Sequence, residues 1–248
     1  MDETMEDATD SNAGAMAFFD HVRELRRRLI VSVLCLGVGF FVAYLLHDRY
    51  IHWLLNPIGE QVYITSIEEG FMMKLRVSAY VGLILSFPVH VYNVVAFVTP
   101  ALTGRELSFL RAMLAGSLAL LLIGGYLAYF QILPLSFQFL KNPAFVPEGA
   151  ETLLGYQKNL LFALRLLFAF IILFQLPLVM ILLMAMNLVD RRQMLKCSRY
   201  VIVLIFVLSA LLTPPDPVSQ IGLSLPLIIL FYLSILVARI FRFGEPDR

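Results

Sequence analysis

The chain has 248 residues, of which 60% are hydrophobic and 15% charged, and its formal net charge is +1. Soluble domains are roughly half apolar and one quarter charged, so this composition excludes an ordinary water-soluble fold, and the near-neutral charge argues against a nucleic-acid-binding protein. The two cysteines, Cys35 and Cys197, have no CxxC spacing, which excludes a disulfide framework and gives no sign of a metal or redox site.

The first residues differ sharply from the rest. Residues 1–15 hold five acidic residues and no Lys or Arg, which is unlike a secretory signal peptide and predicts a solvated, disordered acidic tail. Residues 16–248 form one predicted membrane domain. It opens with an amphipathic helix, because Phe18, Val22, Leu25 and Leu29 recur at helical spacing, and we expect this helix to lie along the membrane surface.

Six apolar segments follow, and they predict an all-α polytopic membrane protein with six transmembrane helices. A span needs roughly twenty apolar residues. The last two spans are expected to be short and to form a shallow hairpin turned at the sequence TPPDP, because only sixteen uncharged residues separate Arg199 from Asp216. The predicted spans are 30–46, 77–98, 112–134, 166–189, 200–213 and 218–238.

The placement of Lys and Arg predicts that both termini are cytoplasmic. With the N-terminus inside, the cytoplasmic segments carry thirteen of the nineteen basic residues, and the opposite loops at 47–74 and 135–160 are the longer ones. The thirteen are Arg23, Arg26, Arg27, Arg28, Arg105, Arg111, Arg191, Arg192, Lys196, Arg199, Arg239, Arg242 and Arg248.

No catalytic motif is present: the four histidines form no HExxH pair, and the GxSxG and GxxxxGK[ST] motifs are absent. An enzyme is therefore not expected, nor is a cofactor or a metal. Three polar residues stand out instead: Glu24 among the arginines, Glu106 after VTPALTGR, and Gln175 in the middle of the fourth span.

Several blocks of sequence resemble one known family. The run HVRELRRRL from His21 to Leu29 resembles the HLxELRxRL opening of the TatC family, the signal-peptide receptors of the twin-arginine translocase. Further similar blocks follow in order over nearly the whole chain outside the acidic tail. They are NP at 56–57, FPVHVYNVVAFVTPALTGRE at 87–106, AYFQILPLSFQFL at 128–140, FQLP at 174–177 and LLTPPDPVSQIGLSLPL at 211–227.

The resemblance implies a function in the bacterial inner membrane. TatC proteins bind twin-arginine signal peptides of folded precursors at the cytoplasmic face. With TatA and TatB type single-span partners, and as homo-oligomers in a receptor complex, they export these precursors using the proton gradient. The resemblance places Glu24, Glu106, Arg26, Arg28 and Phe97 at the signal-peptide site. Carboxylates suit this role, because a guanidinium can bridge them with two hydrogen bonds.

Each of these charges also has a purely structural explanation. Glu24 lies four residues before Arg28, so the two can form an intrahelical ion pair. Glu106 starts the third span, where an acid interacts favourably with the helix dipole. Arg26 and Arg28 match the family motif, but membrane orientation and contact with anionic lipids explain most of their charge.

Gln175 lies near the middle of the bilayer, where an unpaired amide is costly, so we expect it to have a partner. Relatives commonly have a glutamate here that contacts TatA or TatB helices. A glutamine keeps the hydrogen bonds but cannot titrate. The alternative is local: Pro177 deprives the Leu173 carbonyl of its helical donor, and the Gln175 amide could satisfy that carbonyl.

Two positions at the predicted periplasmic side, Pro57 and Asp216, also match the family. Asp216 followed by Pro217 is typical of a helix N-cap and its first residue, and Pro57 is interpreted as a loop or cap element. Leu233 stands where relatives often carry a glutamate. The alternative function is a proton-coupled secondary transporter, but the two halves of the chain show no internal repeat, and none of the predicted spans contains an acidic residue, a lysine or an arginine.

Overall fold

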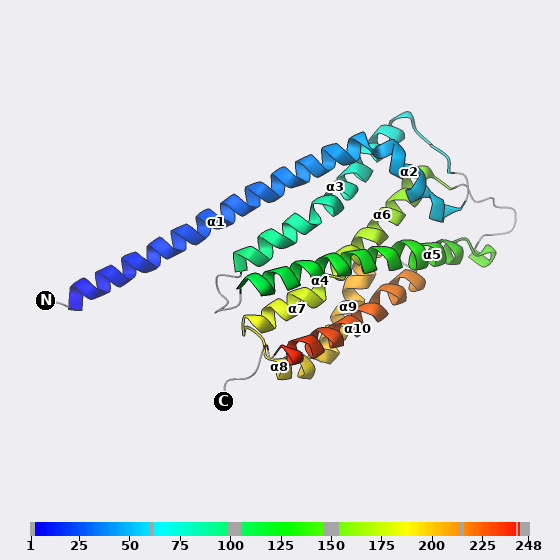
Figure 1. Cartoon of the computed structure of the whole chain (residues 1–248). Helices are drawn as coiled ribbons and strands as arrows, with labels where there is room; N and C mark the ends of the chain where they lie inside the picture. Colours follow the sequence, from blue (N-terminus) through cyan, green and yellow to red (C-terminus); the bar gives the residue numbers. More distant parts are fainter. Residues whose placement is uncertain are drawn as a thin grey trace.

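The computed structural model describes residues 3–59, 62–98, 106–145, 154–213, 216–241 and 243. It describes side chains from His21 onward, with the exception of Val98, Glu106, Leu107, Leu110 and Pro143. The helices of the described chain run alternately back and forth along one bundle (Figure 1). We call one end of it the α8 end, where α3 and α10 finish and α4 begins, and the other the α2 end.

The helices account for most of the described chain. In order they are α1 (Glu3–Leu45), α2 (His47–Leu55), the 3₁₀ turn η1 (Asn56–Ile58), α3 (Ile67–Val98), α4 (Glu106–Tyr126), the π-helical segment η3 (Leu127–Ile132), α5 (Leu133–Leu140), the 3₁₀ turn η4 (Pro143–Phe145), α6 (Tyr156–Leu173), α7 (Leu176–Ala185), α8 (Arg191–Lys196), α9 (Ser198–Leu212) and α10 (Pro217–Ile240).

The prediction of an all-α membrane protein is confirmed. Five helical segments of the described chain are long and apolar enough to cross a bilayer: His21–Leu45, Ile67–Phe97, Arg111–Leu140, Tyr156–Ala185 and Pro217–Ile240. The fifth predicted span, 200–213, corresponds to α9, which has 15 residues and is short, as expected. The expectation that α10 is also short is wrong, because it has 24 residues.

The first helix is longer than the first predicted span. The surface helix and the first span are parts of one continuous helix, α1, because no proline or glycine interrupts the chain between Phe18 and Gly37. The backbone of α1 already starts at Glu3, but the side chains before His21 are not described. The acidic tail therefore stays a prediction.

The third helix begins ten residues before the predicted span 77–98. Ser66 and Glu69 explain this early start, because the Glu69 carboxylate accepts the Ser66 N–H at 3.3 Å and so caps the first turn. Lys74 and Arg76 therefore lie inside the helix, although Lys74 falls in the predicted loop 47–74 and Arg76 just before the predicted span.

A close crossing holds α1 against α3. A Cβ atom added at Gly39 would lie 2.6 Å from the Gly82 carbonyl oxygen, and one added at Gly82 would lie 2.6 Å from the Phe40 nitrogen. Only glycine permits this approach of two backbones, which is how helices pack tightly inside membranes. The crossing fixes α1 as an antiparallel neighbour of α3.

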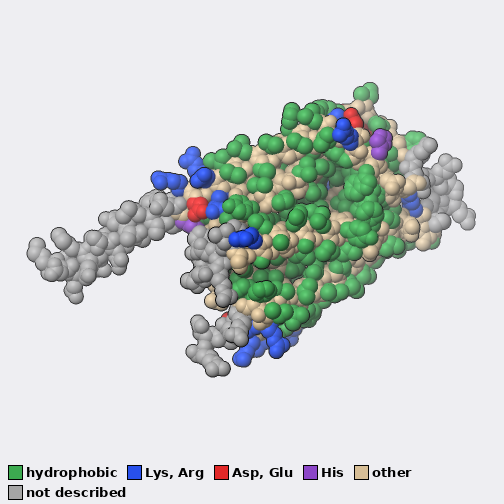
Figure 2. All heavy atoms as spheres, viewed as in Figure 1, with side chains coloured by type: hydrophobic (Ala, Val, Ile, Leu, Met, Phe, Trp, Pro, Cys, Tyr) green, Lys and Arg blue, Asp and Glu red, His purple; other side chains and the backbone are tan. Residues whose placement is uncertain are grey.

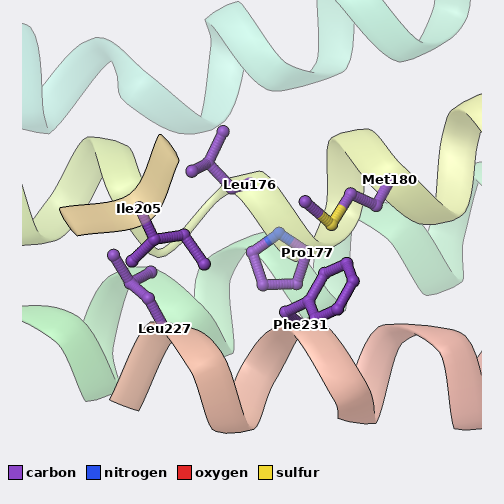
Figure 3. Close-up of a pocket in the computed structure, with 6 residues that line it drawn as sticks. All are labelled: Leu176, Pro177, Met180, Ile205, Leu227 and Phe231. Carbon is purple, nitrogen blue, oxygen red and sulfur yellow. The ribbon is translucent and has the colours of Figure 1, made fainter. Parts of the chain in front are cut away.

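The fourth span is broken between α6 and α7. The chain turns at Phe174 and Gln175, and Pro177 enters α7 within its first two positions. Figure 3 shows Pro177 next to Phe231 of α10, beside an apolar void of about 10 Å³ that Ile205 of α9 also lines. The break therefore packs against α9 and α10.

Charges gather at the ends of the bundle. Figure 2 shows hydrophobic side chains across the middle of the visible face, with Lys and Arg toward the two ends. This distribution suits an apolar band in the bilayer core between two polar interfaces.

Candidate functional site

Polar and aromatic side chains meet between α1 and α3 at the α8 end, and we call His21, Glu24, Arg28, Asn93 and Phe97 the α1–α3 cluster. The Asn93 amide donates to the Ser32 hydroxyl at 2.8 Å and to the Arg28 carbonyl at 3.4 Å. Arg28 in turn donates from Nη1 to the Asn93 carbonyl at 3.4 Å. Asn93 is buried, so it joins the two helices through both its backbone and its side chain.

Arg28 also holds Glu24. Its Nε donates to Glu24 Oε1 at 3.0 Å, and Nη2 forms a second, shorter bond to the same oxygen. This confirms the intrahelical pair that the spacing of four residues predicts. Neither bond reaches Oε2. The ion pair orients the Glu24 carboxylate through Oε1, and Oε2 takes no part in the ion pair.

Phe97 stacks on His21 with ring centroids 4.2 Å apart and planes at 25°. Asn93 and Phe97 are one helical turn apart on α3, just as Arg28 and Glu24 are on α1. The structure therefore brings three predicted site residues, Glu24, Arg28 and Phe97, to one place. Arg26 is exposed on α1. His21 and Asn93 were not singled out from the sequence, because only the pairing of the two helices gives them partners.

Glu106 is only partly described. It is the first residue of α4, at the α8 end, as expected. Its side chain, and residues 99–105 before it, lie outside the described residues.

Gln175 is buried and finds its partner within the chain. Its Oε1 accepts the Ser117 hydroxyl of α4 at 2.9 Å, and its Nε2 donates to the Ser117 carbonyl at 3.4 Å. The expectation of a partner is confirmed, but these bonds go to Ser117 and not to the Leu173 carbonyl that the sequence analysis named. An α4 residue 58 positions away could not be identified from local spacing.

Asp216, just before α10, and Pro57, in η1, lie at the opposite end of the bundle, as expected (Figure 1). Asp216 caps α10 by accepting the Ser219 N–H at 2.7 Å, as its position before Pro217 predicts. Pro57 lies in η1, where Ile58 accepts a bond from Lys141 Nζ at 2.5 Å. Leu233 is exposed on α10, and the neighbouring Ser234 is buried.

Glu69 is a polar residue that the sequence analysis missed. Besides capping α3, its carboxylate accepts the Gln157 N–H at 2.7 Å in the first turn of α6. It is 3% exposed and joins the starts of two helices. The sequence pattern Ser66-x-x-Glu69 could have predicted the cap. The bond from Gln157 of α6 could not be predicted, because it depends on the tertiary structure. No group of three or more His, Cys, Asp or Glu in the described parts of the chain could hold a metal ion.

Known proteins resemble the chain over nearly its whole length. Residues 20–226 match the family model for TatC, the Sec-independent protein translocase protein. A TatC protein of Desulforapulum autotrophicum is 35% identical over 230 residues, covering 90% of this chain and 84% of the relative. That of Escherichia coli strain K12 is 34% identical, covering 89% and 87%. A crystal structure of the twin-arginine translocase receptor TatC in DDM superposes with a TM-score of 0.79 at 30% identity, covering 91% of this chain and all of the other.

Proposed function

The chain belongs to the TatC family of Sec-independent protein translocase proteins, and on that premise we propose that it is the receptor for twin-arginine signal peptides. Members of this family are translocase components and not enzymes, which favours this role over a secondary transporter. We further propose that the protein lies in the bacterial inner membrane, with its α8 end cytoplasmic. It assembles there with TatA and TatB type single-span proteins and with its own copies, and exports folded precursors using the proton gradient.

The α1–α3 cluster is the observation that carries the proposal. Arg28 holds one oxygen of Glu24 and takes no part in bonding the other. The other oxygen, Oε2, is therefore suited to accept a hydrogen bond from a guanidinium of the ligand. The stacked rings of His21 and Phe97 offer an apolar surface beside it. Glu106, at the start of α4, supplies a second carboxylate for the adjacent arginine of the ligand. Arg28 then acts by orienting Glu24.

Peptide titration tests this role. We expect Glu24→Gln and Glu106→Gln each to weaken binding of an Arg-Arg signal peptide while membrane insertion stays normal. The expected loss of binding free energy is roughly 1.5–3 kcal/mol, which is the contribution of a sheltered charged hydrogen bond. An exposed pair would contribute only about 0–1 kcal/mol. A Lys-Lys peptide should bind poorly to the wild type, because an ammonium has no planar fork.

The matched control is Glu68→Gln, which neutralises an exposed acid at the first turn of α3, at the α2 end. It should bind the Arg-Arg peptide like the wild type. Equal affinities for both peptides across the wild type and all three variants would disprove the proposed site.

A further inference from the structure

A large apolar groove opens beside the helices that form the α1–α3 cluster. Its volume is about 850 Å³, and α1, α2, α3, α4, η3 and α6 all contribute to its walls. The groove extends from the middle of the spans toward the α2 end. Aliphatic side chains such as Val81, Leu122 and Leu167 make up most of its lining.

Aromatic residues gather where the groove meets α2. Tyr50, Trp53 and Tyr129 line this part, and the rings of Trp53 and Tyr129 stack with centroids 3.7 Å apart. Tyrosine and tryptophan are typical of the boundary between hydrocarbon and head groups. The groove is therefore mainly aliphatic, and it has an amphipathic end at α2.

The hydroxyl groups of two tyrosines in the lining bond within the chain. Tyr50 donates to the Ala43 carbonyl at 2.9 Å, and Tyr129 donates to the Trp53 carbonyl at 2.6 Å. Helices that associate in membranes rely on small residues at the contact and on hydrogen bonds between helices. This lining consists mainly of large side chains, with few small residues such as Gly125. A flexible hydrocarbon chain fits it better than a helix does.

A cation lies at the aromatic end. Arg49 is exposed and lies four residues before Trp53, on the same face of α2. The neighbouring acid, Asp48, is paired with Lys74 at 3.7 Å. A guanidinium is well suited to binding a phosphate with two hydrogen bonds. We propose that the groove binds one acyl chain of a membrane phospholipid, whose phosphate is held by Arg49 at the α2 end.

Filling the groove tests the proposal. A Cβ atom added at Gly125 meets nothing within 4 Å, so Gly125→Leu places a side chain in the groove without a backbone clash. Gly37→Leu is the matched control, because Gly37 is equally open but lies outside the groove. We expect Gly125→Leu to lower phospholipid affinity about tenfold, because its side chain displaces roughly two methylene groups of the acyl chain. Gly37→Leu should leave the affinity unchanged.

Trp53 is the only tryptophan of the chain, so it reports from the groove without labelling. The purified full chain in nanodiscs is titrated with phosphatidylglycerol brominated on its acyl chain, and quenching of Trp53 is measured. Phospholipid retained after purification is counted by native mass spectrometry. Equal quenching and retention in wild type and Gly125→Leu would overturn the proposal. Displacement of the brominated lipid by an added single-span helical peptide, one peptide per chain, would instead assign the groove to a helix.

Arg49→Gln keeps the test decisive if Gly125→Leu does not fold. Loss of one basic residue near the lipid surface should lower phosphatidylglycerol affinity about fivefold. It should not change affinity for a brominated diacylglycerol, which has the chains but no phosphate. Equal losses for both lipids, or no loss for either, would contradict the assignment of the head group to Arg49.

Discussion

At the scale of single residues, Gln175 shows how the chain satisfies a polar group inside the membrane. Ser117 offers both a donor and an acceptor to the amide, so Gln175 is already satisfied within the chain. The close packing around it supports a structural role, since a Cβ added at Gly124 would lie 2.9 Å from Phe174, the residue before Gln175. Contact of Gln175 with a TatA or TatB helix stays a proposal.

A double-mutant cycle separates these two roles. Gln175→Leu should lower the thermal stability of the purified protein, since it leaves the Ser117 groups without their partner, at a cost of roughly 1–3 kcal/mol for a buried group. Ser117→Ala should also destabilise, and the double variant should be less unstable than the sum of the two predicts, because the residues are directly coupled. If stability is unchanged while a copurifying TatA or TatB type partner is lost, Gln175 serves the partner contact.

At the scale of elements, the α1–α3 pair sets the geometry of the proposed receptor site. The glycine crossing lies in the middle of α3 and near the C-terminal end of α1, and the α1–α3 cluster lies several turns away at the α8 end. Because the crossing and the cluster lie on the same two helices, we expect a change in helix separation at Gly39 and Gly82 to move Glu24 relative to Asn93 and Phe97. The site therefore depends on two residues that cannot contact the ligand.

A pair of glycine variants tests this dependence. We expect Gly82→Ala to destabilise the protein by about 1–3 kcal/mol, because its Cβ would overlap the Phe40 backbone and force the helices apart. Signal-peptide affinity should fall as well. Gly37→Ala is the control: Gly37 lies on α1, two residues before Gly39, and a Cβ added there meets nothing within 4 Å. This variant should be neutral or slightly stabilising, since alanine favours helix over glycine. Thermal unfolding and peptide titration of both variants provide the measurements, and similar values for the two would refute the crossing as a determinant of the site.

At the scale of the whole molecule, the basic residues lie unevenly at the two ends. The described part of the α8 end carries Arg23, Arg26, Arg27, Arg28, Arg111, Arg191, Arg192, Lys196, Arg199 and Arg239. The positive-inside tendency therefore supports a cytoplasmic α8 end. The back-and-forth path of the helices brings the start of α1 and the end of α10 to this same end (Figure 1).

Cysteine labelling tests the orientation. In a background with Cys35 and Cys197 replaced by serine, cysteines introduced at positions 60 and 148 should react with an impermeant reagent added to whole cells. Cysteines at 105 and 192 should react only after permeabilisation. The first three positions lie outside the described residues, and Arg192 is exposed in α8. The reverse labelling pattern would overturn the proposed topology.

The sequence alone determined the features that depend on neighbours in the chain. The apolar spans, the Glu24–Arg28 pair and the Asp216 cap were all predicted, because helix formation, pairing at four residues and capping act over one or two turns. The errors of the sequence-based prediction were also local. The charged residues Lys74 and Arg76 led to a predicted span that began ten residues too late in α3, and α10 is longer than predicted.

The tertiary structure decided which helices contact each other and at which residues along their length. The crossing of Gly39 and Gly82, the stacking of His21 on Phe97, the pairing of Gln175 with Ser117, the bond from Gln157 to Glu69 and the apolar groove all join residues far apart in sequence. In a membrane, lipid is as apolar as the side chains it surrounds, so hydrophobic pattern does not reveal which face packs against protein. Close backbone approach and a few hydrogen bonds make that choice, and these exist only once the helices have assembled.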